Sequence, residues 1–129
     1  MIVVDSSVWI ARLRNSSTPQ TMAFDDIDDF KKVILGDIVL LEILQGAPDN
    51  RHAENIQKKL STFAVIPFLT PDLAIKAARN YRMLRARGIT IRKTADLIIG
   101  TYCIEHGHQL LHADRDFLPM VEHLGLRAI

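Results

Sequence analysis

Five carboxylates of this 129-residue chain stand where their neighbours predict a buried environment: Asp5, Glu42, Asp96, Asp114 and Asp116. Burying an ionised carboxylate is costly unless it pairs with a cation or binds a metal. Several such groups gathered without cations would repel one another and raise one another's pKa values. Mg²⁺ would remove that repulsion, because this hard cation favours oxygen ligands. The chemistry that needs such a site is phosphoryl transfer or phosphodiester hydrolysis, in which metal ions activate water and neutralise developing charge.

Three of these acids follow predicted strands. Asp5 comes directly after the apolar run Ile2-Val3-Val4, and Asp114 and Asp116 come after the strand predicted over 109–112. Ligand sites of open α/β sheets lie outside the carboxyl ends of the strands. We therefore expect these acids on the same edge of one sheet.

The other two acids interrupt apolar helical segments. Glu42 is embedded in 38–44, where no basic residue lies within one helical turn, and Asp96 precedes Leu97-Ile98-Ile99. Each acid alone has a structural explanation: Asp5 as a helix cap, Asp96 as a favourable charge at a helix N-terminus, or Glu42 on an exposed helix face. Taken together, acids that approach one edge from distant positions favour a shared site.

The elements that must position these acids alternate between short apolar strands and helices. We expect strands at 2–4, 32–35, 64–66, 109–112 and 126–129. We expect helices from Ser6 or Ser7, as the cap, to Leu13, and then over about 19–30, 38–44, 50–63, 70–88, 94–107 and 115–124. This alternation predicts a parallel or mostly parallel sheet covered by helices, and no linker divides it, so residues 1–129 are expected to form one α/β domain.

The composition excludes several classes of protein. Hydrophobic residues make up 48% and charged residues 24% of the chain, which is typical of a globular protein and argues against disorder. The best candidate for a membrane span, Val33 to Leu44, is interrupted by Asp37 and Glu42, and no secretory signal is recognisable, so we expect a soluble, cytoplasmic protein. The single cysteine, Cys103, excludes an internal disulfide framework and a cysteine-built zinc site. No glycine-rich phosphate loop is present.

The net charge of +1 conceals a basic segment. No acid occurs between Asp72 and Asp96, a stretch that contains Lys76, Arg79, Arg82, Arg85, Arg87, Arg92 and Lys93. Such a distribution fits an anionic partner, but it also fits a solvated helix face. Both interpretations stay open from the sequence alone.

Four motifs in order along the chain give it a family resemblance. They are Ile2–Ile10, Leu41–Gly46, Thr94–Gly100 and Leu110–Phe117. In length and in motif order the whole chain resembles PIN-domain ribonucleases and, more narrowly, the VapC toxins of bacterial toxin–antitoxin pairs. The resemblance implies a three-layer α/β/α domain, an endoribonuclease that depends on Mg²⁺ or Mn²⁺ and cleaves RNA, inhibition by a VapB-type antitoxin, and a homodimer.

The resemblance also implies roles for individual residues. Asp5 and Asp96 match the principal metal ligands, and Glu42 and Asp114 match the other members of the acidic quartet. Ser7 matches the small hydroxyl residue that supports the first carboxylate. With RNA as the anionic partner, Arg79, Arg82 and Arg85 become candidates for contacts to its backbone, because they recur every third residue.

The last motif contains two acids, so it does not fix the fourth site carboxylate. Asp114 comes first after the strand, and we expect it to be the site acid. Asp116 matches an additional acid that also counts as a candidate metal ligand. We expect Asp116 to cap the short helix that follows.

A receiver-like signalling module is the alternative, because its acidic pocket also binds Mg²⁺ and accepts a phosphoryl group. Such a module requires adjacent acids before the first site aspartate and a lysine after a late strand. Here Asp5 follows three apolar residues, and no lysine follows Lys93. The sequence therefore favours the nuclease.

Overall fold

Five short parallel strands form the sheet in the computed structural model, which describes all residues from 1 to 129. The strand order is β3-β2-β1-β4-β5. The strands are β1 (Ile2–Val4), β2 (Val33–Gly36), β3 (Val65–Ile66), β4 (Gln109–Leu111) and β5 (Arg127–Ala128). In the register of the central pair, Val3 lies beside Leu110 and Val4 beside Leu111. All four side chains are buried, as expected for a parallel sheet covered on both faces.

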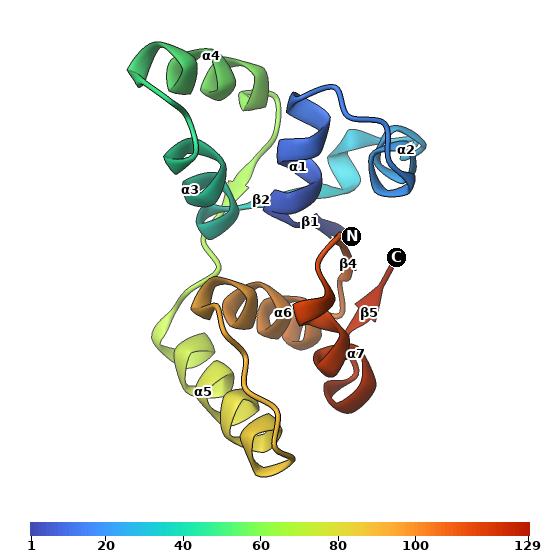
Figure 1. Ribbon diagram of the computed structural model, residues 1–129, viewed down its shortest axis with the longest axis vertical. Coiled ribbons are helices and arrows are strands. Elements are labelled where there is room, and N and C mark those ends of the chain that lie inside the picture. Colours follow the sequence, from blue (N-terminus) through green and yellow to red (C-terminus); the bar gives the residue numbers. More distant parts are fainter.

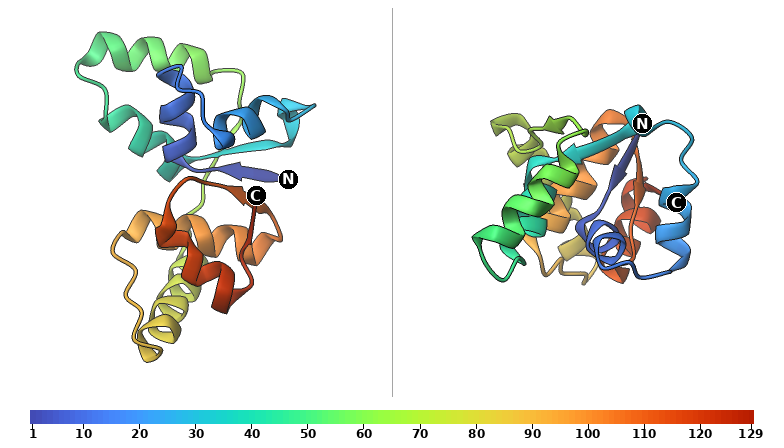
Figure 2. Two further views of the ribbon diagram at one scale, coloured as in Figure 1. Left: turned by 45° about the vertical axis from the view of Figure 1, so that its right-hand side comes forward. Right: turned by 90° about the horizontal axis from the view of Figure 1, so that it is seen from above.

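Helices cover the sheet in two layers. They are α1 (Ser6–Leu13), α2 (Pro19–Asp25), α3 (Asp37–Gln45), α4 (Asn50–Leu60), α5 (Pro71–Ala86), α6 (Thr94–His106) and α7 (Leu118–Leu124), with the 3₁₀ turns η1 (Phe30–Lys32) and η2 (Arg115–Phe117). Figure 1 shows α1 to α4 above the strands and α5 to α7 below them, and the left view of Figure 2 shows the same division. The predicted three-layer α/β/α fold is confirmed, and the sheet is entirely parallel.

The order of the strands explains the two layers. The chain first moves outward from β1 through β2 to β3, and it then returns to β4 and β5 on the other side of β1. Because parallel crossovers are right-handed, the reversal of direction moves the later helices to the opposite face. The reversal also creates a switch point between β1 and β4, where α/β sheets bind ligands.

Most helix boundaries follow the local signals of the sequence. Pro19 and Pro71 occupy the first turns of α2 and α5, and the preceding Thr18 and Thr70 accept a backbone N–H as caps. Helix α6 ends at Gly107, which adopts a left-handed conformation with φ 68°.

Four boundary predictions are wrong in detail. The helix predicted over 19–30 ends at Asp25, because Asp29 instead starts the separate turn η1 by accepting the Lys31 N–H. The helix predicted over 50–63 ends at Leu60. The cap of α1 is Asp5 rather than a serine, and the helix predicted over 115–124 is divided into η2 and α7.

One contiguous core of 26 buried hydrophobic residues fills the space between the layers. The Trp9 ring packs edge-on against Phe24 and Phe63, and Phe117 is fully buried, so these aromatic residues are core residues. Gly100 allows α7 to approach α6, since a Cβ at this position would lie 2.1 Å from the Met120 Sδ. This contact brings η2 and its acids close to α6. None of the helices is both long and apolar enough to cross a membrane.

Candidate metal centre

Asp5 links the end of β1 to the start of α1. Its backbone N–H donates to the Leu111 carbonyl at 2.9 Å, which continues the pairing of β1 with β4. Its Oδ2 accepts the backbone N–H of Ser7 at 3.1 Å and the Ser7 hydroxyl at 2.6 Å. The residue is only 3% exposed, and its other oxygen, Oδ1, is buried without a hydrogen-bond donor. The cap role of Asp5 thus uses one oxygen and leaves the other free.

Two serines after Asp5 hold the neighbouring segments in place. The Ser7 hydroxyl donates to Asp5 and accepts the backbone N–H of Ala113 at 3.3 Å, so it joins the ends of β1 and β4. The Ser6 hydroxyl donates to the Glu42 Oε1 at 3.2 Å. The pair therefore orients acids from two different elements.

Asp96 lies in the first turn of α6, in the opposite helical layer from Glu42. It is 3% exposed, and its Oδ2 is buried without a donor. Burial, followed by the negative charges of Asp5, Asp114 and Glu42, raises the pKa of Asp96 to about 7, while Lys93 opposes the shift. A positive charge placed beside Asp96 would therefore stabilise its ionised form.

Glu42 lies half-buried on α3. Burial raises the pKa of Glu42 above its usual range, and the negative charge of Asp5 has the next largest effect. The hydrogen bond from Ser6 and the charge of Lys93 act in the opposite direction. Glu42 therefore faces the other site acids and not solvent alone.

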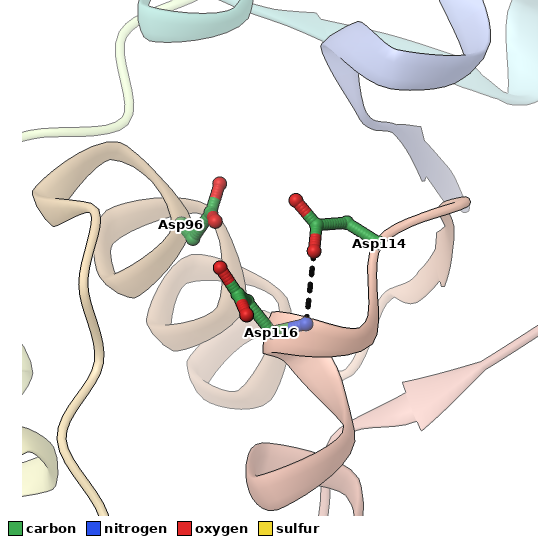
Figure 3. Close-up of side chains that lie close together, drawn as sticks. All are labelled: Asp96, Asp114 and Asp116. Atoms are coloured by element: carbon green, nitrogen blue, oxygen red, sulfur yellow. Dashed lines mark hydrogen bonds between the residues drawn. The ribbon is translucent and has the colours of Figure 1, made fainter.

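Asp114 and Asp116 follow β4 and approach Asp96. The three carboxylates contribute oxygen atoms that all lie within 4.8 Å of one another, and Figure 3 shows Asp96 on α6 facing the two acids of the η2 segment. Asp5 and Glu42 are not part of this closest group, but the charges of both raise the pKa of Asp96. The structure thus brings all five predicted acids to the switch point between β1 and β4.

The predicted roles of Asp114 and Asp116 are wrong in one respect. Asp114, not Asp116, caps η2, because its Oδ1 accepts the backbone N–H of Asp116 at 2.9 Å (Figure 3). This hydrogen bond is the main cause that lowers the pKa of Asp114, and Lys93 lowers it further. Asp116 lies inside η2, and its side chain is free to face Asp96.

The acids fit a hard divalent cation. The donor set consists of carboxylate oxygens, and two of these, Asp5 Oδ1 and Asp96 Oδ2, are buried without a partner. Oxygens on opposite sides of a bound Mg²⁺ lie about 4.2 Å apart. The spread of 4.8 Å among Asp96, Asp114 and Asp116 is close to this value, so the three carboxylates are near enough to one another to hold a single ion.

The predicted RNA-contact residues lie away from these acids. Arg79, Arg82 and Arg85 are exposed on α5, and no ion pair joins them to the five acids. Lys76 on the same helix is engaged with Asp72 and Glu105, at 3.1 Å in each case.

Sequence reasoning missed three residues at the site. Ser6 holds Glu42, Lys93 pairs with Asp114 at 3.3 Å, and Arg92 pairs with Asp116 at 3.6 Å. The only available signal was adjacency: Ser6 follows Asp5, and the two basic residues directly precede the Thr94–Gly100 motif. Their partners are distant in sequence, so the contacts required the fold.

Comparisons with known proteins agree with this geometry. The family model for the PIN domain matches residues 2–121. The VapC ribonuclease Mb1587 of Mycobacterium bovis and the ribonuclease VapC11 of Mycobacterium tuberculosis are each 28% identical over 133 aligned positions, which cover 99% of this chain and 97% of the relative.

Solved structures share the fold at lower sequence identity. The VapBC2 complex of Rickettsia felis, bound to a promoter DNA fragment, contains a chain that matches with a TM-score of 0.79 at 15% identity, covering 100% of this chain and 98% of that one. A chain of FitAcB from Neisseria gonorrhoeae matches with a TM-score of 0.76 at 21% identity, covering 100% and 96%. A toxin–antitoxin complex from Klebsiella pneumoniae gives a TM-score of 0.70 at 18% identity, covering 91% and 90%.

Proposed function

The chain belongs to the PIN domain family, and we propose that it is a metal-dependent endoribonuclease that acts as the toxin of a VapBC-type toxin–antitoxin pair. The observation that carries this proposal is the meeting of five acids at the switch point of the sheet, with two buried carboxylate oxygens unpartnered. The names of the relatives, which are VapC ribonucleases, support the activity. The receiver-like alternative is not favoured, because the strand order 3-2-1-4-5 differs from the 2-1-3-4-5 order of flavodoxin-like folds.

We assign the metal to Asp5, Asp96, Asp114 and Asp116, with Mg²⁺ as the expected ion and Mn²⁺ as a substitute. When bound, such an ion supplies positive charge beside the phosphodiester and activates water. The chain contributes the rigid placement of the ligands: Ser7 fixes the Asp5 carboxylate, and the η2 turn fixes Asp114. These contacts support a site that is formed before the metal arrives.

Glu42 is the candidate for handling protons. Ser6 occupies its Oε1, so Oε2 remains available to accept a proton from the attacking water. The raised pKa of Glu42 suits this role, because a general base works best when its pKa approaches the working pH.

RNA contacts are assigned to the exposed face of α5. Arg79, Arg82 and Arg85 carry no ion pair to a protein carboxylate, so their charges are available to backbone phosphates. Because the substrate is RNA, we place the activity in the cytoplasm.

A VapB-type antitoxin is the proposed partner. The matched structures include VapBC complexes, which supports a protein inhibitor of the same kind. An inhibitor of an acidic pocket gains from an inserted arginine, since the planar guanidinium fits carboxylates. The contact between Arg92 and Asp116 supports this idea, because it shows a guanidinium already seated against a site acid.

We further propose that residues 1–129 form one domain that pairs as a homodimer. The one contiguous core supports a single domain. Leu41 on α3, Leu69 in the loop before α5 and Ile75 near the start of α5 are 55%, 52% and 71% exposed. Figure 1 shows α3 and the start of α5 at the same, left-hand side of the molecule, and we take their exposed apolar side chains as the contact with a second copy. Changing Ile75 to Asp should shift the mass measured by light scattering from dimer to monomer.

The activity is tested with the full chain purified free of any partner. It should cleave RNA with Mg²⁺ or Mn²⁺ and stop when EDTA is added, and expression alone should arrest bacterial growth until an antitoxin is co-expressed. Asp5→Asn should fold normally and lose cleavage. Undiminished cleavage by Asp5→Asn, or cleavage that continues in EDTA, would contradict the metal-site assignment, and harmless expression of an active protein would contradict the toxin role alone.

A further inference from the structure

The site acids differ in whether a cation accompanies them. Asp114 pairs with the Lys93 Nζ at 3.3 Å, and Asp116 pairs with the Arg92 Nη2 at 3.6 Å. No salt bridge involves Asp5, Glu42 or Asp96. The two cations therefore stand at one side of the acid group only, and the metal-site assignment gives them no role.

Both cations are positioned to meet a ligand from solvent. The Lys93 side chain is 58% exposed and the Arg92 side chain 82% exposed, whereas the acids they contact are 26% and 23% exposed. Lys93 occupies the position before α6 without capping that helix through its side chain. Both cations are thus more exposed than the acids they contact.

We propose that Lys93, assisted by Arg92, binds the phosphodiester group of RNA that lies beside the acids, an inference that rests on the proposed nuclease function. Exposed ion pairs contribute little to stability and exchange readily. If the Asp114 carboxylate held a divalent cation, that cation would repel the Lys93 ammonium group, which would then be available to another anion. The ammonium group offers three hydrogen-bond donors, and the anion that comes closest at that moment is the phosphate of the substrate.

The path of the chain supports this choice over the arginines of α5. Figure 1 shows the segment after α5 running from the far end of that helix back to the start of α6. This segment begins near Arg85 and Arg87 and ends at Arg92 and Lys93 beside the acids. The arginines of α5 can hold RNA at a distance, while Lys93 reaches the group at which the acids act.

The experiment compares four variants of the full chain: Lys93→Gln, Lys93→Arg, Arg92→Gln and the control Lys58→Gln. Lys58 is an exposed lysine on α4 with no ion-pair partner, so it controls for the loss of one positive charge. RNA cleavage in Mg²⁺ gives kcat/KM and its dependence on salt, calorimetry without RNA gives the Mg²⁺ affinity, and melting curves report folding.

We expect Lys93→Gln to lower kcat/KM about tenfold, or about 1.4 kcal/mol. Its salt slope should flatten by roughly 0.7, the value of one phosphate contact to a single strand. Mg²⁺ should bind at least as tightly as before, because a competing cation has been removed. Lys93→Arg should restore most of the activity, Arg92→Gln should have a smaller effect, and Lys58→Gln should match the unsubstituted protein.

The outcomes separate this inference from the function on which it rests. If the unsubstituted protein cleaves RNA and Lys93→Gln keeps the salt slope of Lys58→Gln, the inference is overturned and the nuclease assignment stands. Weaker Mg²⁺ binding by Lys93→Gln would also overturn it, because Lys93 would then act only by positioning Asp114. If the unsubstituted protein does not cleave RNA, the proposed function is wrong, and the inference that rests on it is wrong as well.

Discussion

Two groups of aspartates in this chain have the same side chains and opposite environments. At the end of α2 Asp25 pairs with Arg12, and in the turn that follows Asp28 pairs with Lys32, each at 3.0 Å, and both acids are exposed. At the sheet edge, Asp5 and Asp96 are buried, and each keeps one oxygen without a donor. The pKa of Asp28 is lowered by its hydrogen bond with Lys32, whereas burial raises that of Asp96 to about 7.

The comparison shows that local density of acids does not make a cation site. Asp25, Asp26, Asp28 and Asp29 are almost contiguous, yet all four are exposed to solvent, and two of them also pair with a basic side chain. The site acids come from positions as distant as 5, 42, 96 and 114, and the parallel sheet brings them to one edge. Burial of Asp5 and Asp96 then prevents water from compensating their charge, and neither forms an ion pair, which leaves a metal as the effective partner of these two acids.

We expect the largest difference between the two groups when one acid of each is changed to asparagine and the RNA turnover of the variants is compared. Asp96→Asn removes a buried ligand charge but keeps the side-chain shape, so we expect RNA turnover to fall at least about a thousandfold, or about 4 kcal/mol of barrier. Asp28→Asn removes an exposed charge and should leave turnover unchanged. Cleavage rates at fixed Mg²⁺ measure both, with calorimetry to show that Asp96→Asn also weakens Mg²⁺ binding. Equal rates for the two variants would remove the functional distinction between the groups.

The second prediction concerns how the free energy of unfolding of the metal-free protein depends on pH. In the folded protein Asp96 keeps its proton up to about pH 7, whereas in the unfolded chain it loses the proton near its ordinary pKa of 3.8. The folded state therefore binds more protons between these values, and its stability should fall as the pH rises from 4 to 8, by on the order of 4 kcal/mol.

Denaturant unfolding at several pH values in EDTA tests this expectation. Asp96→Asn should be the more stable protein at pH 8 and should show a shallower slope, with a remainder from Glu42, whose pKa is raised in the same direction. Saturating Mg²⁺ should stabilise the unsubstituted protein most at high pH, because the ligands must be deprotonated. A stability that rises with pH in EDTA would show that Asp96 is ionised and paired in the free protein.

The sequence predicts that the acids share one edge of the sheet, but it does not predict which acid caps η2 or which basic side chains contact the acids. Asp5 was predictable because it directly follows a strand of β-branched residues, and the alternation of strands and helices predicts that the acids share an edge. The choice of cap was not predictable, because Asp114 and Asp116 are both suited to the role and the backbone path after β4 decides between them. The contacts of Lys93 and Arg92 depend on how the loop after α5 returns to α6, which no local pattern specifies.

The third prediction concerns Asp114, which caps η2 and is also a proposed metal ligand. Asp114→Asn keeps an oxygen that can accept the Asp116 N–H but loses the ligand charge, so turnover should fall at least about tenfold, or about 1.4 kcal/mol, with little change in the melting temperature. Asp114→Ala should lose turnover and also about 1 kcal/mol of stability, because the η2 cap is gone. Asp116→Asn should be milder for turnover, and Asp116→Ala should leave stability nearly unchanged. If Asp116→Asn is the more damaging for turnover, the ligand roles of the two acids must be exchanged.

The smallest effect is expected for the exposed aspartates, and it tests whether their charges contribute to stability or to Mg²⁺ binding. Asp28 and Lys32 are four residues apart, and both side chains are exposed, so water and salt screen the pair. Asp28→Asn, Lys32→Gln and the double variant should therefore melt at the same temperature in physiological salt, and any difference should appear only at low salt. Mg²⁺ affinity should also be unchanged, because Asp28 already has a cation and full access to solvent. A loss of Mg²⁺ binding in Asp28→Asn would mean that acid density alone recruits the ion, and burial would no longer explain why one group of aspartates is a site and the other is not.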